Sequence, residues 1–396
     1  MRTIGTKALG LRAPIIKSGD DLKKIVVQSV LDAAEAKELE IKDRDILAIT
    51  ESILARDENN YCTIQEVKGD LQAKFSSDTI GVLFPITSRN RFAIILRAIS
   101  LAFKKVIIQF SYPGDEVGNA LIDPELVEDK IDNPYERVLT KAQFEEIFGE
   151  ANHPFTGVDY LSYYQKLVED SGAQCEIILA NNPLELLKHT NSIIVATTHT
   201  RFTLKKRLLK NGAKKVLGLD EIMNSPLNNS GYNEKYGLLG SNKASEDTLK
   251  LFPINCEKFV KEVQADLLKE TGKKVEVMIY GDGAFKDPVG KIWELADPVV
   301  SPGYTDGLEG TPNELKLKYL ADNEFKGLKG NKLQEAIENK IQTKENKLKG
   351  KMETEGTTPR RITDLVGSLS DLVSGSGDKG TPFVYVQGYF DNYGSK

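Results

Sequence analysis

A segment rich in acids and glycines holds most of the residues in this chain that could do chemistry. The apolar run 275–280 ends in Gly281, Asp282 and Gly283, and a long loop follows. Long loops are usually functional. A carboxylate directly after an apolar strand lies where open α/β sheets bind metal or substrate, and glycines let the backbone approach a ligand. Asp282 is therefore the first candidate site residue, although an Asp in such a loop can also serve only a turn.

More carboxylates follow on the same segment, namely Asp287, Glu294, Asp297, Asp306 and Glu314. Divalent metals that serve phosphoryl chemistry usually take one or two protein carboxylates, together with phosphate oxygens and water. We predict that Asp282 ligates such a metal with Asp287, and that Glu294, Asp306 and Glu314 are further possible helpers. Any one of these acids could instead be an ordinary solvated loop residue.

A second cluster of small and polar residues comes earlier in the chain. Gly240, Ser241, Asn242 and Lys243 offer backbone amides, an amide side chain and an ammonium within four residues. This combination is typical of an anion or nucleotide contact. We predict that Ser241 and Asn242 bind the cofactor and that Lys243 takes part in catalysis. The alternative is an ordinary loop that leads into a capping sequence.

The elements that must position these residues can be read from the apolar pattern of the N-terminal third. An amphipathic helix is expected from Asp21 onward, a buried strand at 45–50, a helix around 94–102 and a strand at 106–110. The strand at 45–50 ends in Thr50, Glu51 and Ser52, a polar cluster in the usual position for a ligand.

The middle of the chain alternates between strand-like and helical patterns. The runs 174–180, 192–198 and 213–219 are typical of buried strands, which indicates a small parallel βαβ layer. Their ends carry Asn181, Asn182, His199, Thr200 and Arg201. We predict that these residues border the substrate cleft and that Arg201 binds an acceptor or carboxylate group. No standard nucleotide-binding motif occurs here.

Composition excludes several classes of protein. The 396 residues are 40% hydrophobic and carry a net charge of -5, which argues against a nucleic-acid or anionic-membrane partner. No apolar run is long enough to span a bilayer. The three cysteines have no metal-like spacing, and the first residues lack a signal-peptide pattern. We therefore expect a cytoplasmic protein with a small-molecule substrate.

Taken in order, five short segments resemble one known family. They follow Gly19-Asp20-Asp21-Leu22 and are DILAITESILAR, YGLLGSN, KLFP, GDGAFKDP and the C-terminal stretch ITDLVGSLSDLVSGSGDKGTPFVYVQG. Together they look like the coenzyme F-420:L-glutamate ligase (gamma-glutamyl ligase) family. The resemblance implies a mixed α/β fold in which residues 1–120 and 229–396 form the ligase-like domain. Residues 121–228 have no counterpart and are expected to be an inserted parallel βαβ subdomain.

The resemblance also implies an activity. Such ligases use GTP and Mg or Mn to activate a carboxylate as an acyl phosphate, couple it to the amine of glutamate, and usually act as homodimers. Transferred by position, Asp282 matches the metal-binding Asp of the family, while Ser241 and Asn242 match its Ser-Asn loop. Gly281 and Gly283 flank the metal-binding position and are expected to contact the cofactor.

Three positions depart from the family pattern. Leu239 stands where the loop has a second Asp, Ser52 stands where a strand end has Lys, and residues 284–288 replace a Gly-Arg-Pro-Trp-Arg segment. Two alternatives therefore stay open. One is a non-catalytic protein that kept the fold and binds a small molecule or nucleotide, and the other is an enzyme of different chemistry in the same cleft.

Overall fold

The chain folds into two compact units. The computed structural model describes residues 3–152, 157–282, 285–286, 293–294, 297–345, 348, 350–354, 360–374 and 377–395. The first unit contains residues 1–53, 255–283 and 299–396, and the second contains 54–254 and 284–298. These boundaries differ from the predicted domain boundaries at residues 120 and 228. The predicted boundaries rest on the family resemblance and stay a prediction.

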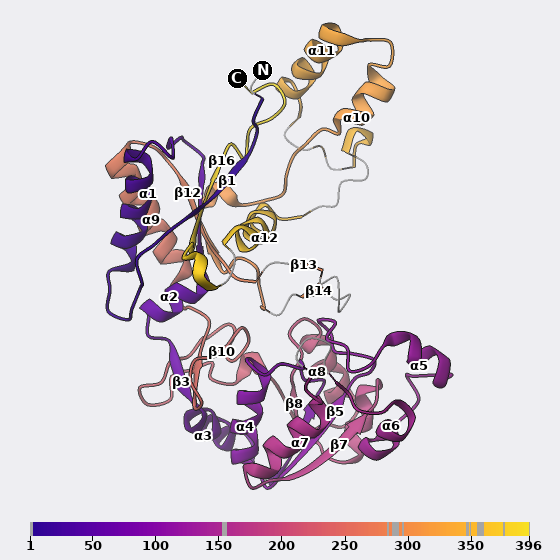
Figure 1. Ribbon diagram of the computed structural model, residues 1–396. Coiled ribbons are helices and arrows are strands. Elements are labelled where there is room, and N and C mark those ends of the chain that lie inside the picture. The colour runs from indigo at the N-terminus through magenta and orange to yellow at the C-terminus, as the bar shows by residue number, and fades with distance from the viewer. Residues whose placement is uncertain are drawn as a thin grey trace. The chain divides into compact units, whose positions relative to one another are not determined.

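A five-stranded sheet forms the centre of the first unit (Figure 1). Its order is β1 (Lys7–Leu11), β16 (Phe383–Gln387), β2 (Ile46–Thr50), β12 (Glu276–Tyr280) and β15 (Gly303–Tyr304). Only β2 and β12 pair in parallel, and the other neighbours are antiparallel. The strand predicted at 45–50 is confirmed as β2. The C-terminal strand, whose partner the sequence does not identify, lies between β1 and β2.

Helices cover both faces of this sheet. The pair α1 (Leu22–Glu35) and α9 (Cys256–Thr271) lies on one face and α12 (Ile362–Ser374) on the other (Figure 1). The predicted start of α1 is confirmed, since the Asp21 side chain accepts a hydrogen bond from the backbone N–H of Lys24. Under α12 the core contains Ile46, Met278 and Val384.

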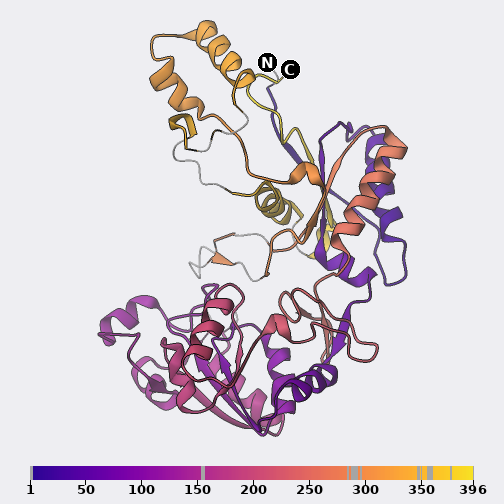
Figure 2. The same cartoon turned by 180° about the vertical axis from the view of Figure 1, so that it is seen from behind.

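A smaller helical segment has its own apolar cluster, to which Ile337, Ile341 and Leu348 contribute. The first two of these residues belong to the charged helix α11 (Gly330–Gln342), which lies beside α10 (Leu317–Tyr319) (Figure 2). Short helical turns complete the unit: η3 (Asp306–Leu308), η4 (Leu320–Glu324), η5 (Met352–Thr354) and η6 (Gly377–Lys379).

The second unit is built on a six-stranded sheet. Its order is β6 (Leu139–Thr140), β7 (Gln174–Leu179), β5 (Lys105–Phe110), β4 (Thr79–Leu83), β8 (Ser192–Val195) and β9 (Lys215–Gly218). All pairs are parallel except the one made by β6. The predicted strands of the middle region are confirmed. The same sheet also takes in β4 and β5, so the parallel layer begins before residue 121.

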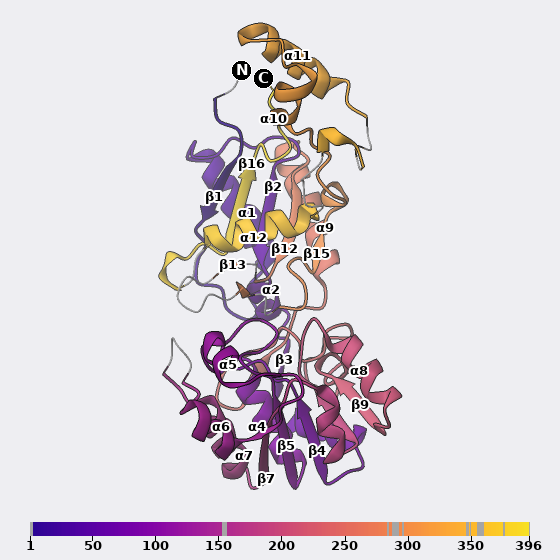
Figure 3. The ribbon, with the colours of Figure 1, turned by 90° about the vertical axis from the view of Figure 1, so that its right-hand side faces the viewer.

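The chain order defines a switch point in this sheet. From β4 the chain proceeds to β5 and β7 on one side, and it later places β8 and β9 on the other side of β4 (Figure 3). On one face, η1 (Pro183–Lys188) and α8 (Arg201–Lys210) contribute Leu186 and Leu208 to a buried cluster. The helices α4 (Phe92–Ala102) and α7 (Tyr160–Asp170) pack against each other and contact β5 and β7.

The remaining elements of the second unit are short. A three-stranded sheet has the order β10 (Asn242–Lys243), β11 (Thr248–Lys250) and β3 (Tyr61–Thr63), and β13 (Phe285–Lys286) pairs with β14 (Trp293–Glu294). The other helices are α2 (Glu51–Asp57), which begins in the first unit, α3 (Ile64–Lys74), α5 (Pro124–Lys130), α6 (Lys141–Phe148) and η2 (Leu219–Glu221). Within the described residues, no helix combines the length and apolarity required to cross a membrane.

Candidate functional site

In the first unit, two acids follow neighbouring parallel strands at the same sheet edge. Because Thr50 pairs with Tyr280 in the register of β2 and β12, the chain segments that continue from them leave the sheet side by side. Glu51 then begins α2 with only 6% of its surface exposed. On the other strand Gly281 donates its N–H to the Val300 carbonyl at 2.8 Å, and Asp282 follows half-buried.

A tyrosine lies beneath this edge. Burial raises the pKa of Tyr280 to about 12, while Ser374 and Thr50 lie close enough to oppose that rise. The phenol is therefore neutral at physiological pH. Its oxygen is buried and makes no hydrogen bond of standard geometry within the described residues. The edge thus combines acids with a buried phenol that can still donate a proton in a hydrogen bond.

Strand register excludes Asp306 as a helper of Asp282. The strand β15 runs antiparallel to β12, with Tyr304 opposite Met278, and the Thr305 N–H donates to the Val277 carbonyl at 2.9 Å. Asp306 therefore lies beside the start of β12, whereas Asp282 follows its end. Six residues of extended strand separate positions 276 and 282, or roughly 20 Å. The prediction that Asp306 could assist Asp282 is wrong for this reason.

Asp297 has a structural partner in the second unit. Its carboxylate is 1% exposed and forms an ion pair of 2.7 Å with the Arg91 guanidinium. Arg91, which precedes α4, thus pairs with an anion from its own chain. Glu314 lies in the first unit near Tyr389, whose pKa is raised by burial and then by the charge of Glu314.

Two predicted residues, Gly283 and Asp287, lie outside the described residues, and for Glu294 only the backbone of β14 is described. Among the described residues, no group of three or more His, Cys, Asp or Glu side chains has metal-binding geometry. A site of one or two carboxylates, completed by phosphate oxygens and water, suits Mg²⁺ or Mn²⁺. Glu51 and Asp282 at one strand edge fit that pattern.

The loop with Ser241 and Lys243 has partners of its own in the second unit. Ser241 is buried and donates its hydroxyl to the Leu238 carbonyl at 2.7 Å, while the Lys243 ammonium lies 2.5 Å from a Glu246 carboxylate oxygen. Leu239, at the position of the family Asp, is 2% exposed. Position 239 is therefore a core position here. The ligand contacts expected of Ser241, Asn242 and Lys243 stay predictions.

Arg201 begins α8 in the second unit. Its Nε lies 3.0 Å from an Asp220 carboxylate oxygen, and its guanidinium also donates to the Thr198 carbonyl and lies 4.1 Å from the Phe202 ring centre. The predicted contact with an acceptor anion would have to compete with Asp220. That contact stays a prediction.

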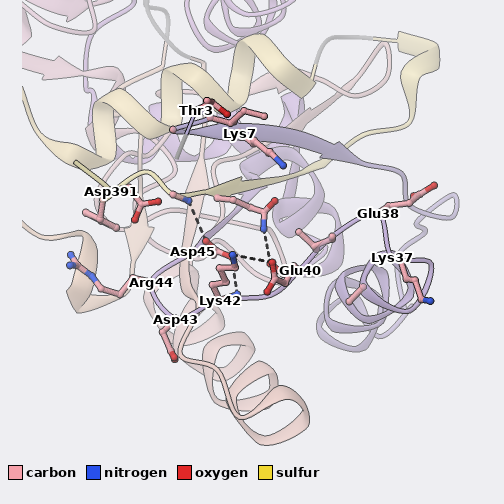
Figure 4. A pocket seen from close by; sticks show the side chains of 17 residues that line it. Thr3, Lys7, Lys37, Glu38, Glu40, Lys42, Asp43, Arg44, Asp45 and Asp391 are labelled. Carbon is pink, nitrogen blue, oxygen red and sulfur yellow. Dashed lines mark hydrogen bonds and ion pairs between the residues drawn. The ribbon is translucent and has the colours of Figure 1, made fainter. Parts of the chain in front are cut away.

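A pocket of about 710 Å³ lies at the opposite end of the first unit's sheet (Figure 4). Its buried floor contains Asp45, which accepts hydrogen bonds from the Lys42 N–H at 2.9 Å and the Tyr385 hydroxyl at 3.2 Å. Burial raises the pKa of Asp45 although these donors oppose the rise. The lining carries both charges, including Lys7, Lys37 and Glu38. This pocket is at the amino end of β2, away from the edge with Asp282.

Sequence reasoning placed Glu51 in a polar cluster but did not pair it with Asp282, because the parallel pairing of β2 and β12 cannot be read from either segment alone. It missed Glu116, in the loop after β5, altogether. The available signal was weaker than for Asp282, namely a pair of acids, Asp115 and Glu116, that follows Gly114 in the loop after an apolar run.

Fold and site together define a class. A mixed α/β protein with acids at the carboxyl ends of parallel strands is a candidate for chemistry on small charged substrates. The family model for F420-0:Gamma-glutamyl ligase matches residues 10–388, nearly the whole chain. The protein therefore belongs to the F420-0:gamma-glutamyl ligase family, as the order of its short motifs indicated, and this membership supports a ligase role. No curated protein matches the chain.

Proposed function

We propose that the protein is a nucleotide- and metal-dependent ligase that forms an amide bond between an amino acid, for which glutamate is our candidate, and a carboxylate acceptor. Membership of the gamma-glutamyl ligase family supports the class of reaction. The observation that carries the site assignment is the position of Asp282 and Glu51 at adjacent ends of the parallel strands β12 and β2.

The reaction has two balanced parts. An acceptor carboxylate oxygen attacks the terminal phosphorus of the nucleotide, which is GTP in our proposal. The nucleoside diphosphate, GDP, leaves, and the acceptor becomes an acyl phosphate. The amine of the amino acid then attacks the acyl phosphate carbonyl, phosphate leaves, and the amine loses a proton. A divalent cation, when bound, neutralises phosphate charge in such chemistry. Asp282 and Glu51 would hold it, with Asp287 as a further candidate ligand.

The remaining candidate residues take supporting roles in this proposal. The glycines Gly281 and Gly283 would allow backbone contact with the nucleotide, while Ser241, Asn242 and Lys243 would contact its phosphates. Arg201 would bind an acceptor carboxylate after release from Asp220. We further propose a cytoplasmic homodimer, in line with the resemblance.

A second function is favoured by one specific observation. Leu239 is buried where the family has an acidic loop residue, so this loop does not supply a carboxylate at that position. A protein that lost this ligand could bind nucleotide or acceptor without turnover. Such a binder would gain thermal stability from its ligand but would release no phosphate.

The test is phosphate release by the full chain. We would supply GTP, Mg²⁺ or Mn²⁺, glutamate and a pool of small carboxylic acids, and identify any amide by mass spectrometry. The ligase proposal requires phosphate release that depends on the amino acid and falls at least a hundredfold in Asp282→Asn at unchanged melting temperature. Stabilisation by GTP without phosphate release, in every metal and acceptor condition, would favour the binder.

A further inference from the structure

The second unit has its own polar centre at the carboxyl edge of its sheet. Open parallel sheets bind ligands at the switch point, because the loops from the two strands there leave toward opposite faces. In this sheet the switch point lies between β4 and β8. The loop after β8, residues 196–200, leads directly into α8.

Four donors in this loop surround one carboxylate. The His199 and Thr200 N–H groups donate to the Glu116 carboxylate at 2.9 and 3.0 Å, and the Thr200 hydroxyl donates at 2.7 Å. The Thr198 N–H donates to it as well. Because these donors lie at the N-terminus of a ten-residue helix, the helix dipole adds positive potential. The loop is therefore arranged to hold an oxyanion.

The carboxylate comes from a distant part of the chain. Glu116 precedes its donors by 82 to 84 residues and belongs to the loop after β5. The preceding residue, Asp115, accepts the Thr87 N–H at 2.9 Å in the loop after β4. Two adjacent acids thus contact both loops of the switch point. Asp115 binds the loop after β4 through Thr87, and Glu116 accepts the hydrogen bonds of the loop after β8.

Two buried oxygens nearby have no hydrogen-bond partner within the described residues. They are Thr197 Oγ1, in a residue 1% exposed, and Gln109 Oε1, in a residue with no exposed surface. Alternation along the strands places Gln109 on the face of Ile107 and Thr197 on the face of Val195. Both of those apolar residues pack in the cluster that Leu208 of α8 joins.

Thr197 directly precedes the donors of the loop in the chain, whereas the Gln109 amide donates to the Ala180 and Asn182 carbonyls at 2.8 Å, on the β7 side of the same sheet edge. Buried polar atoms nearly always have partners, so a pair of unpaired ones needs an explanation. A polar ligand bound at this edge would supply the missing partner of Thr197. Solvent can reach the edge, because His199 and Thr200 are exposed.

We propose that the switch point between β4 and β8 binds a small ligand that carries an oxyanion, either a phosphate or a carboxylate, and that Glu116 is an internal stand-in which the ligand displaces. The amides of 198–200 hold the anion, while the Thr197 hydroxyl meets a neutral polar group of the ligand. This site is built from residues of the second unit alone, and the inference does not depend on the ligase reaction.

The direct test is Glu116→Gln in the full chain, with Glu128→Gln as the matched control on the exposed surface of α5. Inorganic phosphate and free glutamate are titrated separately by calorimetry, and the amide resonances of 198–200 are followed. We expect one probe to bind Glu116→Gln at least ten times more tightly than it binds the wild type or the control. Preference for phosphate or for glutamate identifies the source of the oxyanion. Equal affinity in all three proteins for both probes would overturn the proposal.

Thr197→Val tests the same site independently of Glu116→Gln and serves if Glu116→Gln does not fold. Thr197→Val keeps the shape and removes only the unpartnered hydroxyl, so its melting temperature should equal or exceed that of the wild type. High concentrations of the preferred probe should shift the amides of 198–200 in the wild type, and Thr197→Val should need at least threefold more probe. No shift of those amides with either probe, or an equal response of both proteins, contradicts the site.

Discussion

The two largest sheets of this protein end in opposite chemistry. At the carboxyl edge of the first unit the strands β2 and β12 run directly into Glu51 and Asp282, so that edge presents acids. At the carboxyl edge of the second unit β8 runs into Thr198, His199 and Thr200, which present backbone N–H groups and a hydroxyl. The first edge suits a cation and the second suits an oxyanion.

In open α/β sheets the strand topology sets which edge can receive a ligand, and the first residues after each strand set the charge that the edge presents. An acid in such a loop also has two distinct uses. Asp282 follows its own strand, whereas Glu116 reaches the donors of another strand's loop. Acids that stabilise the fold and acids that bind a ligand should differ in how their substitution changes stability.

The largest expected effect comes from the buried ion pair. Arg91→Ala leaves the Asp297 carboxylate, which is 1% exposed, without its guanidinium partner. Removal of one member of a buried pair costs about 3 kcal/mol or more, because the other charge stays buried. Urea unfolding should show this loss, and the exposed neighbour variant Arg89→Ala should show almost none. Equal stability of the two variants would mean that Asp297 is not a structural acid.

Asp115 should behave as a structural acid beside Glu116. It accepts hydrogen bonds from the N–H and hydroxyl of Thr87 and from the N–H and side-chain amide of Asn119. Asp115→Ala leaves these donors without an acceptor and should lower the free energy of unfolding by about 2 kcal/mol. Asp129→Ala on the exposed side of α5 is the control for urea unfolding. If the urea midpoint of Asp115→Ala were unchanged, the contact of Asp115 with Thr87 would not hold the loop after β5 in place.

Gly240 tests whether the loop around Ser241 is structural. Its φ is +71°, and an added Cβ would lie 2.5 Å from the Phe252 ring and 3.0 Å from Pro298. Gly240→Ala should therefore cost more than about 1 kcal/mol. Gly212→Ala has the same kind of backbone angle, φ +101°, but no atom within 4 Å, so the difference between their melting temperatures isolates the packing. If the melting temperature fell less in Gly240→Ala than in Gly212→Ala, the loop around Ser241 would be able to move to meet a ligand.

The smallest effect concerns Asp45, at the amino end of β2 and far from Asp282 along the strand. Burial raises its pKa above the ordinary value of 3.8 in the folded chain. Between 3.8 and the raised value the folded chain holds a proton that the unfolded chain has lost, so stability falls as pH rises through that window. Asp45→Asn should flatten this part of the stability curve measured by thermal unfolding. If the slope of stability against pH were unchanged in Asp45→Asn, the pH dependence in this window would come from other groups.

Much of the fold could be predicted from the sequence, because long apolar runs dominate it. The strands β2, β7, β8 and β9 and the helix α11 all follow from local apolar patterns. The pairing of these strands does not follow, since it depends on partners far away in the chain. That β4 and β5 join β7 and β8 in one sheet is an example.

Less of the candidate site's geometry could be predicted, for the same reason. Asp282 could be selected because its signal, an apolar run followed by Gly-Asp-Gly, is local. Asp306 was wrongly grouped with it, because nothing in the loop sequence shows that β15 returns antiparallel along β12. The contact of Glu116 with the 198–200 loop also depends on tertiary pairing, and no local pattern indicates it.

The most direct test of the central claim is a Mn²⁺ titration of the full chain by calorimetry, with and without a non-hydrolysable GTP analogue. We predict that the analogue raises Mn²⁺ affinity at least tenfold in the wild type and in Asp306→Asn, whose carboxylate lies at the other end of β12. In Asp282→Asn the affinity should fall at least tenfold at an unchanged melting temperature. Equal Mn²⁺ affinity in all three proteins, with no effect of the analogue, would contradict a metal-dependent ligase site at this strand edge.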